Sequence, residues 1–91
     1  RMRILAVDDD KLIRMNLGLM LGRAGFDVDL AADAAEARAM LDAHRYELLV
    51  VDVALPDANG LDIVREALRS VPAAKAIMIS GSCPYMIDHS V

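Results

Sequence analysis

Aromatic residues are scarce in this sequence, and cysteine is nearly absent. The 91 residues include one phenylalanine, two tyrosines and no tryptophan, so aromatics make up 3% of the chain, and the one cysteine is Cys83. A lone cysteine cannot form an internal disulfide, and no cysteine and histidine residues stand at the spacing of metal ligands. These absences exclude a disulfide framework and a Cys/His metal site, and they predict a reducing compartment.

Long hydrophobic runs and an excess of basic residues are also missing. No window approaches the run of about 18 apolar residues that a membrane span needs, and the N-terminus leads into a charged cluster rather than a signal peptide. Acidic residues outnumber basic ones by 14 to 10, and the net charge of -4 disfavours nucleic acid or an anionic membrane as a partner. We therefore expect a cytoplasmic protein without nucleic-acid or membrane partners.

The sequence nevertheless has enough apolar residues to form a folded core. Hydrophobic residues make up 56% of it, which excludes a disordered chain. Because the commonest domains contain about 100 to 150 residues, this chain has room for one domain, covering 1–91. A two-domain enzyme is thereby excluded.

Four short apolar segments, at 4–7, 26–30, 48–51 and 76–80, predict β-strands. The first and third are continuous and rich in branched residues, which is typical of strands buried on both faces of a sheet. In the second, apolar residues alternate with Asp27 and Asp29, which indicates a strand with one wetter face at a sheet edge.

The segments between these strands carry apolar residues at the helical period. The first covers 11–24 and precedes Gly25, which favours the end of a helix. The second opens at Asp33, with Glu36 placed as in a capping box, and the third covers 63–71 and ends before Pro72. The residues of the first helix that we expect to face the core are Ile13, Leu17, Met20, Leu21 and Ala24.

This alternation of strands and helices predicts an α/β fold. Short connections imply a doubly wound parallel sheet with right-handed crossovers and helices on both faces. Ligands of such sheets bind beyond the carboxyl ends of the strands, where the chain order reverses. We therefore expect the functional residues at those strand ends.

Acidic residues follow two of the predicted strands at this end. Asp8, Asp9 and Asp10 end the first strand, and Asp52 ends the third. If these strands are neighbours, their backbones lie about 4.8 Å apart, so the carboxylates converge and repel one another unless a cation is present. Mg²⁺ suits such a site, because it binds one or two carboxylates and leaves room for phosphate oxygens.

Two residues at this edge indicate phosphoryl chemistry. Asp52 lies between valines at the end of a buried strand, which makes it a candidate carboxylate nucleophile beside a bound cation. Ser80 ends the fourth strand before Gly81, so its hydroxyl could reach a phosphoryl oxygen. The alternative is that the aspartates are solvated loop residues or helix caps, with Asp9 or Asp10 capping the first helix.

Three motifs together resemble the receiver domain of two-component response regulators. They are Ile-Leu-Ala-Val-Asp-Asp-Asp at 4–10, Leu-Leu-Val-Val-Asp-Val-Ala-Leu-Pro-Asp-Ala-Asn-Gly at 48–60, and Ile-Met-Ile-Ser-Gly at 77–81. Their order and spacing agree with that family from about Arg3 to Ser82. The resemblance implies a flavodoxin-like fold with strand order 2-1-3-4.

The resemblance also implies a role for each residue of the site. Asp52 would be phosphorylated by a histidine kinase or a phosphotransfer protein, and Ser80 would be the hydroxyl switch. Asp8, Asp9 and Asp52 would hold Mg²⁺ together with the backbone carbonyl of Ala54. Such a module is a phosphoacceptor rather than an enzyme, with at most self-catalysed phosphorylation and dephosphorylation. The loop with Pro56, Asp57 and Gly60 we interpret as structural, with Gly60 supplying a backbone shape that larger residues resist.

The chain departs from the family pattern after the fourth strand. The family's fifth strand, its last helices and the lysine that pairs with the phosphoryl group have no counterpart, so we expect a C-terminally incomplete receiver. Segment 76–80 would then be an open sheet edge, which favours a homodimer through this edge. The first helix also favours association, because Leu12, Met15 and Leu19 lie off its core stripe. The tail starts like a helix at Pro84, although residues 85–87 could instead cover the edge.

Three functions fit these observations. The leading one is a magnesium-dependent phosphoacceptor of a two-component relay. The alternative is a module that keeps the fold without phosphorylation and binds kinases or copies of itself. A small magnesium-dependent phosphohydrolase ranks last, because so short a chain offers no evident acid or substrate pocket.

Overall fold

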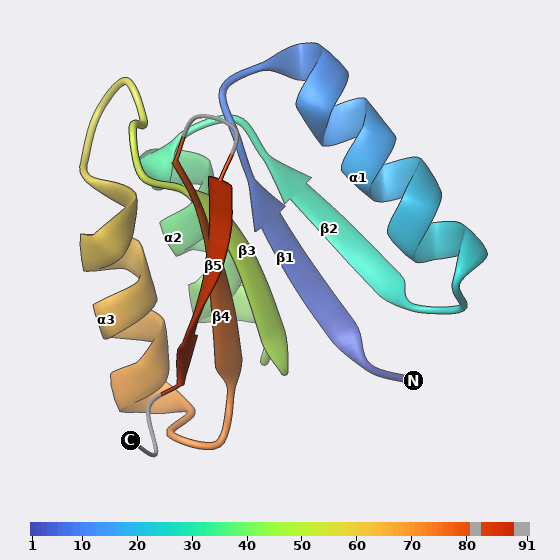
Figure 1. Ribbon diagram of the computed structural model, residues 1–91. Coiled ribbons are helices and arrows are strands. Elements are labelled where there is room, and N and C mark those ends of the chain that lie inside the picture. Colours follow the sequence, from blue (N-terminus) through green and yellow to red (C-terminus); the bar gives the residue numbers. More distant parts are fainter. Residues whose placement is uncertain (81–82, 89–91) are drawn as a thin grey trace.

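Figure 1 shows the computed structural model, which describes the backbone of residues 1–80 and 83–88 and the side chains of residues 1–79. Strands and helices alternate along the chain until two strands follow each other at its end. The elements are β1 (Arg3–Val7), α1 (Lys11–Arg23), β2 (Asp27–Ala31), α2 (Ala34–Ala43), β3 (Leu48–Asp52), α3 (Gly60–Ser70), β4 (Lys75–Ser80) and β5 (Cys83–Asp88).

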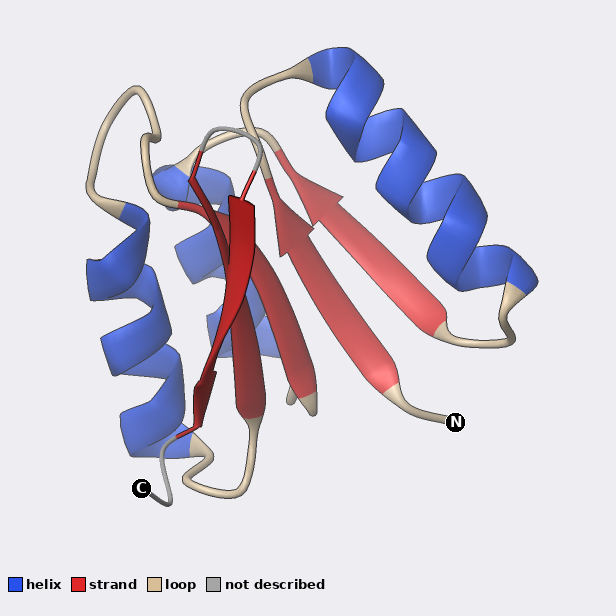
Figure 2. Cartoon of the chain, viewed as in Figure 1, coloured by secondary structure: helices blue, strands red, loops and turns tan. Residues whose placement is uncertain are grey.

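One sheet contains all the strands, with β1 and β3 as neighbours in its interior. β1 pairs in parallel with β2 and with β3, and β3 pairs in parallel with β4. The sheet order is β2-β1-β3-β4-β5, so the predicted order of the four parallel strands is confirmed. These four strands end at the same edge of the sheet, which is uppermost in Figure 2.

A fifth strand, β5, follows β4, although no strand after the fourth was predicted from the sequence. It runs antiparallel to β4, with Tyr85 opposite Met78 and Ile87 opposite Ala76. The predicted covering of the β4 edge by residues 85–87 is therefore confirmed, while the helical start at Pro84 is wrong, because proline is also accepted in edge strands. The expectation of an open β4 edge is therefore wrong, since β5 already occupies the hydrogen-bonding groups on that side, and the predicted homodimer through β4 loses its premise.

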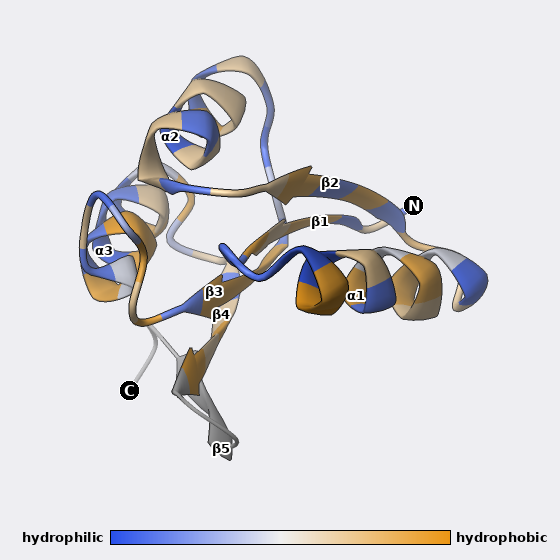
Figure 3. Ribbon diagram, turned by 90° about the horizontal axis from the view of Figure 1, so that it is seen from above, coloured by the Kyte–Doolittle hydropathy of each residue, from blue (hydrophilic) through white to orange (hydrophobic). Residues whose placement is uncertain are grey.

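The two faces of the sheet have separate cores because successive strand residues point to opposite sides. Leu5, Val7 and Val51 face the α2 and α3 side, and Ile4 and Ala6 face the α1 side. All five are fully buried. Figure 3 shows the sheet seen from above, with α1 on one face and α2 and α3 on the other, as the doubly wound prediction requires.

Helix α1 packs on the sheet more loosely than its sequence predicts. None of its residues is buried, and Met20, expected on the core stripe, is 62% exposed. Leu17 and Leu21 make the contact with the sheet, and Gly18 lets the helix approach the side chain of Leu30. The real contact stripe is thus rotated relative to the predicted one. The predicted exposure of Leu12, Met15 and Leu19 is confirmed.

Each helix begins at a polar cap that its sequence supplies. Asp10 caps α1, Asp33 caps α2 and Asn59 caps α3, each by accepting hydrogen bonds from backbone N–H groups of the first turn. In the ranges 1–80 and 83–88, no helix has the length and apolar character needed to cross a membrane.

Candidate functional site

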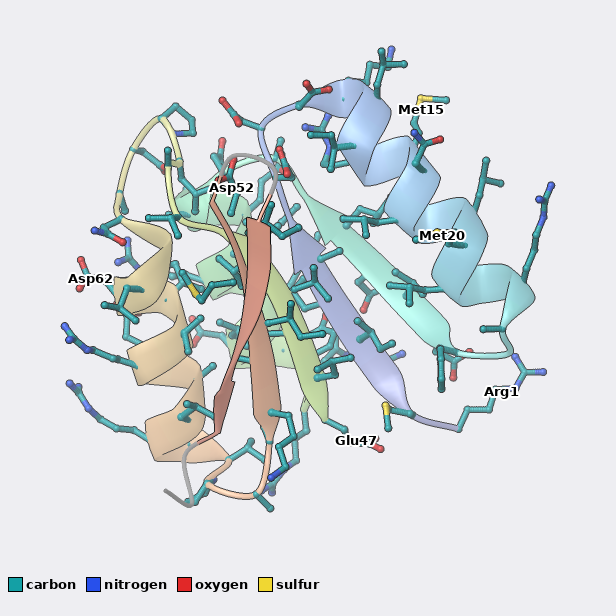
Figure 4. The ribbon with its side chains drawn as sticks, viewed as in Figure 1. Arg1, Met15, Met20, Glu47, Asp52 and Asp62 are labelled. Atoms are coloured by element: carbon teal, nitrogen blue, oxygen red, sulfur yellow. The ribbon has the colours of Figure 1, made fainter. Side chains whose placement is uncertain are left out.

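Three carboxylates meet at the carboxyl ends of β1 and β3. Asp8 and Asp9 follow β1, and Asp52 is the last residue of β3. One oxygen from each of the three side chains lies within 4.8 Å of the others. The cause is the parallel register of β1 and β3, which places Val7 opposite Val51 and so brings the carboxyl ends of these two strands to the same level. Figure 4 shows Asp52 at this end of β3, with Glu47 at the opposite end of the sheet.

Asp8 is the buried member of this cluster. Its residue is 1% exposed, and its Oδ1 accepts a hydrogen bond of 2.9 Å from the Asp10 amide. Its Oδ2 is buried without any hydrogen-bond partner. Burial raises the pKa of the Asp8 carboxyl above its ordinary value, although the Asp10 amide opposes the rise. The negative charges of Asp52 and Asp9 raise this pKa further.

Asp52 is half-buried and is held by its own loop. Its Oδ1 accepts a hydrogen bond of 3.1 Å from the Ala54 amide, and the next residue is tied to the sheet because Val53 N donates to Ile79 O at 2.9 Å. Asp52 therefore presents a carboxylate at the surface from a fixed backbone.

Gly60 supports Asp52 through a lack of space. A Cβ atom at Gly60 would collide with the carbonyl oxygen of Asp52, and it would also press on the side chain of Val51. The φ angle of Gly60 does not lie in the left-handed region. The sequence expectation that larger residues are resisted here is therefore right, but its attribution to an unusual backbone shape is wrong. Glycine is required because α3 begins directly against the end of β3.

The cap alternative applies to only one aspartate of the first cluster. Asp10 accepts hydrogen bonds from Leu12 N at 2.9 Å and Ile13 N at 3.3 Å and caps α1. Asp9 is exposed and belongs to the carboxylate cluster. Ser80 ends β4, but its side chain lies outside the described residues, so its role as a switch hydroxyl stays a prediction.

Two residues near the cluster were missed by sequence reasoning. Arg14 donates a hydrogen bond of 2.8 Å from Nη1 to the carbonyl oxygen of Asp8, which ties α1 to the end of β1. Asp57, assigned to a structural loop, accepts hydrogen bonds from two amides at the start of α2. The signal for Arg14 was its spacing, because a helical side chain leans back over the turn before it. No sequence signal links Asp57 to α2.

The donor set fits a hard divalent cation. A buried carboxylate oxygen without a partner, next to two further carboxylates, is the environment that a cation would stabilise. Oxygen ligands of this kind are those preferred by Mg²⁺. Asp8, Asp9 and Asp52 therefore fit the predicted magnesium site in chemistry and position.

Comparison with known proteins identifies the family. The model of the response regulator receiver domain matches residues 4–88. The chain belongs to this family. Among curated proteins, this receiver domain is 46% identical over 69 residues to the response regulator MprA of Mycobacterium leprae, covering 76% of the chain and 30% of that protein. It thus spans about a third of the length of the curated relatives it matches.

Solved receiver structures resemble this domain closely. A response regulator of Burkholderia pseudomallei, solved with a phosphorylated aspartic acid, a calcium ion and citrate, has a TM-score of 0.83 at 25% identity, over 91% of this chain and 49% of that one. The regulator TrrA of Thermotoga maritima, in complex with Mg²⁺ and BeF, has a TM-score of 0.80 at 31% identity, over 88% and 70%. These likenesses confirm the flavodoxin-like fold predicted from the sequence.

Proposed function

We propose that this receiver domain accepts a phosphoryl group on Asp52 in a two-component relay and that the transfer depends on Mg²⁺. The observation that carries the proposal is the meeting of Asp8, Asp9 and Asp52 within 4.8 Å. Asp52 is the half-buried, strand-end member of that cluster, and the Burkholderia relative carries its phosphoryl group on an aspartic acid.

The transfer would run from a phosphohistidine to Asp52. A carboxylate oxygen of Asp52 attacks phosphorus, the P–N bond of the donor breaks as the P–O bond forms, and the imidazole takes up a proton. Mg²⁺ would neutralise charge on the transferring group, with Asp8, Asp9, Asp52 and the Ala54 carbonyl as its protein ligands. Asp8 holds its place because the Asp10 amide fixes one of its oxygens and leaves the other for the cation.

The partners we propose are a histidine kinase or a phosphotransfer protein, and the location is the cytoplasm. The homodimer that we propose uses the exposed apolar side of α1, where Leu12 is 70% and Leu19 is 55% exposed. The same side supports the second candidate function, an interaction module that works without phosphorylation. Ser80 remains the proposed switch hydroxyl, and the module is proposed to be a phosphoacceptor rather than an enzyme.

Phosphorylation with a small donor tests the proposal. The domain is incubated with acetyl phosphate and Mg²⁺, and its intact mass is measured beside Asp52→Asn and the control Asp62→Asn. Asp62 lies in the first turn of α3, away from the cluster. Its replacement by asparagine removes one negative charge, as Asp52→Asn does. Wild type and the control should gain one phosphoryl group, whereas Asp52→Asn should gain none. A gain in all three proteins would remove Asp52 from its role, and no gain in wild type would favour the interaction module.

A further inference from the structure

Asp57 joins the loop after β3 to the start of helix α2. Its Oδ1 accepts a hydrogen bond of 2.8 Å from Ala34 N, and its Oδ2 accepts one of 3.1 Å from Ala35 N. These amides are the first two of α2, and the third, Glu36 N, donates to Asp33 at 2.8 Å. The first turn of α2 is thus capped by two aspartates, of which one comes from a distant loop.

The carboxylate of Asp57 is well suited to this contact. The N-terminal end of a helix carries partial positive charge from its free N–H groups, which attracts an anion. The hydrogen bonds from Ala34 and Ala35 lower the pKa of the Asp57 carboxyl below its ordinary value. Asp57 is therefore ionised at neutral pH and accepts both hydrogen bonds as an anion.

Helix α2 gives this contact a firm anchor. Ala34 and Ala37 are fully buried against the sheet. Further along α2, Arg38 donates two hydrogen bonds of 3.0 Å to the carboxylate of Glu66 on α3. The amides that hold Asp57 thus belong to an element fixed by both packing and a bidentate ion pair.

The loop that carries Asp57 is short and closed at its base. Ala54 and Asn59 form a bridge between their backbones, and Gly60 N donates to Val53 O at 2.8 Å. Between the bridged residues lies the segment 55–58, in which Pro56 restricts one backbone angle. Only Leu55 and Pro56 separate Asp57 from Ala54, so few rotatable backbone angles lie between them.

We propose that Asp57 is a positioning residue of the phosphoacceptor site. By holding the tip of the loop on α2, it keeps the backbone of Ala54 in place beside Asp52, where the Ala54 amide donates to Asp52 Oδ1 at 3.1 Å. This inference rests on the proposed function, because the Ala54 carbonyl is one of the proposed ligands of Mg²⁺. Asp57 itself is not one of the three carboxylates of the cluster.

Replacing Asp57 by its neutral isostere tests the inference. Asp57→Asn keeps the size of the side chain but loses the charge and one of the two acceptors, and Asp62→Asn is the charge-matched control. Two quantities are measured on each variant of the 91-residue chain: hydrogen exchange of the Ala54 amide by NMR, and Mg²⁺ affinity by titration. Urea unfolding confirms that each variant is folded under the assay conditions.

We expect Asp57→Asn to speed exchange at Ala54 and to weaken Mg²⁺ binding by about tenfold, the size typical of residues that orient metal ligands. The control should leave both unchanged. If folded Asp57→Asn kept either the hydrogen-exchange rate of the Ala54 amide or the Mg²⁺ affinity of wild type, the inference would be overturned. If wild type itself bound no Mg²⁺, the proposed function would fail, and the exchange at Ala54 would still decide whether Asp57 holds the loop.

Discussion

Removing the charge of Asp8 should stabilise the metal-free domain. Asp8 is 1% exposed, its Oδ2 has no partner, and the carboxylates of Asp9 and Asp52 lie within 4.8 Å. Asp8→Asn keeps an oxygen that can accept the hydrogen bond from the Asp10 amide, and it places an NH₂ group at the position of the unpartnered Oδ2. That NH₂ group can donate to a neighbouring carboxylate, so repulsion is replaced by attraction.

The magnitude follows from the separation of the charges. Two unit charges 4.8 Å apart repel by about 3.5 kcal/mol at an effective dielectric constant near 20 and by about 0.9 kcal/mol in water. Because Asp9 is exposed and Asp52 is half-buried, we use the range between these two values as the order of magnitude of the repulsion for each pair. We expect Asp8→Asn to raise the free energy of unfolding by about 1 to 3 kcal/mol in the absence of divalent cations.

Urea unfolding with a chelator and with Mg²⁺ measures this effect. With the chelator, Asp8→Asn should unfold at higher urea than wild type. Added Mg²⁺ should stabilise wild type, because a ligand that binds only the folded state shifts the equilibrium, and it should leave Asp8→Asn unchanged. Asp62→Asn, which removes an exposed charge on α3, should respond to Mg²⁺ as wild type does. A metal-free Asp8→Asn less stable than wild type would refute the reasoning about electrostatic repulsion.

Three further predictions concern residues around the site and the far end of the sheet. Gly60→Ala should destabilise by more than about 2 kcal/mol and slow phosphorylation of Asp52, because its Cβ collides with the Asp52 carbonyl; an unchanged urea midpoint would contradict this. Tyr46→Phe should cost about 1 to 2 kcal/mol in thermal unfolding, since Tyr46 OH donates to Asp29 at 2.7 Å; a neutral change would show that solvent replaces this bond. Arg38 lowers the pKa of Glu66, so this pair stabilises the fold above the pKa of unfolded glutamate and loses its effect as pH falls through the lowered value. Glu66→Gln should thus reduce stability at neutral pH and match wild type once the pH has fallen below the lowered pKa of Glu66, and a stability difference that stays constant with pH would exclude the ion pair as its cause.

Much of the fold was predictable because hydrophobic patterns report burial directly. Ile4 and Ala6 are buried on one face of β1, and Leu5 and Val7 on the other, as a continuous apolar strand requires. The carboxylate cluster was predictable for a related reason. Once the first and third strands are parallel neighbours, their carboxyl ends lie at the same edge of the sheet, and so do Asp8 and Asp52. The local pattern was enough to predict the two faces of β1, whereas the strand order that makes β1 and β3 neighbours was implied by the family resemblance.

Features that depend on a choice between distant partners were not predictable. The residues of β5 could pair with β4 or begin a helix, and their composition does not separate these outcomes. The apolar residues of α1 exceed what one sheet face covers, so the helical period alone did not show that Met20 would be exposed. Asp57 is separated by 23 and 22 positions in the sequence from the two amides that it contacts in α2, Ala34 and Ala35. No local sequence pattern marks a cap of this kind.

Paramagnetic broadening by Mn²⁺ is the most direct test of the claim that Asp8, Asp9 and Asp52 form one cation site. In ¹⁵N-labelled domain, Mn²⁺ should selectively broaden the amide signals of residues 8–10 and 52–54, and excess Mg²⁺ should restore them. The broadening should be lost in Asp8→Asn. Broadening centred elsewhere, or none at these two strand ends, would contradict the account.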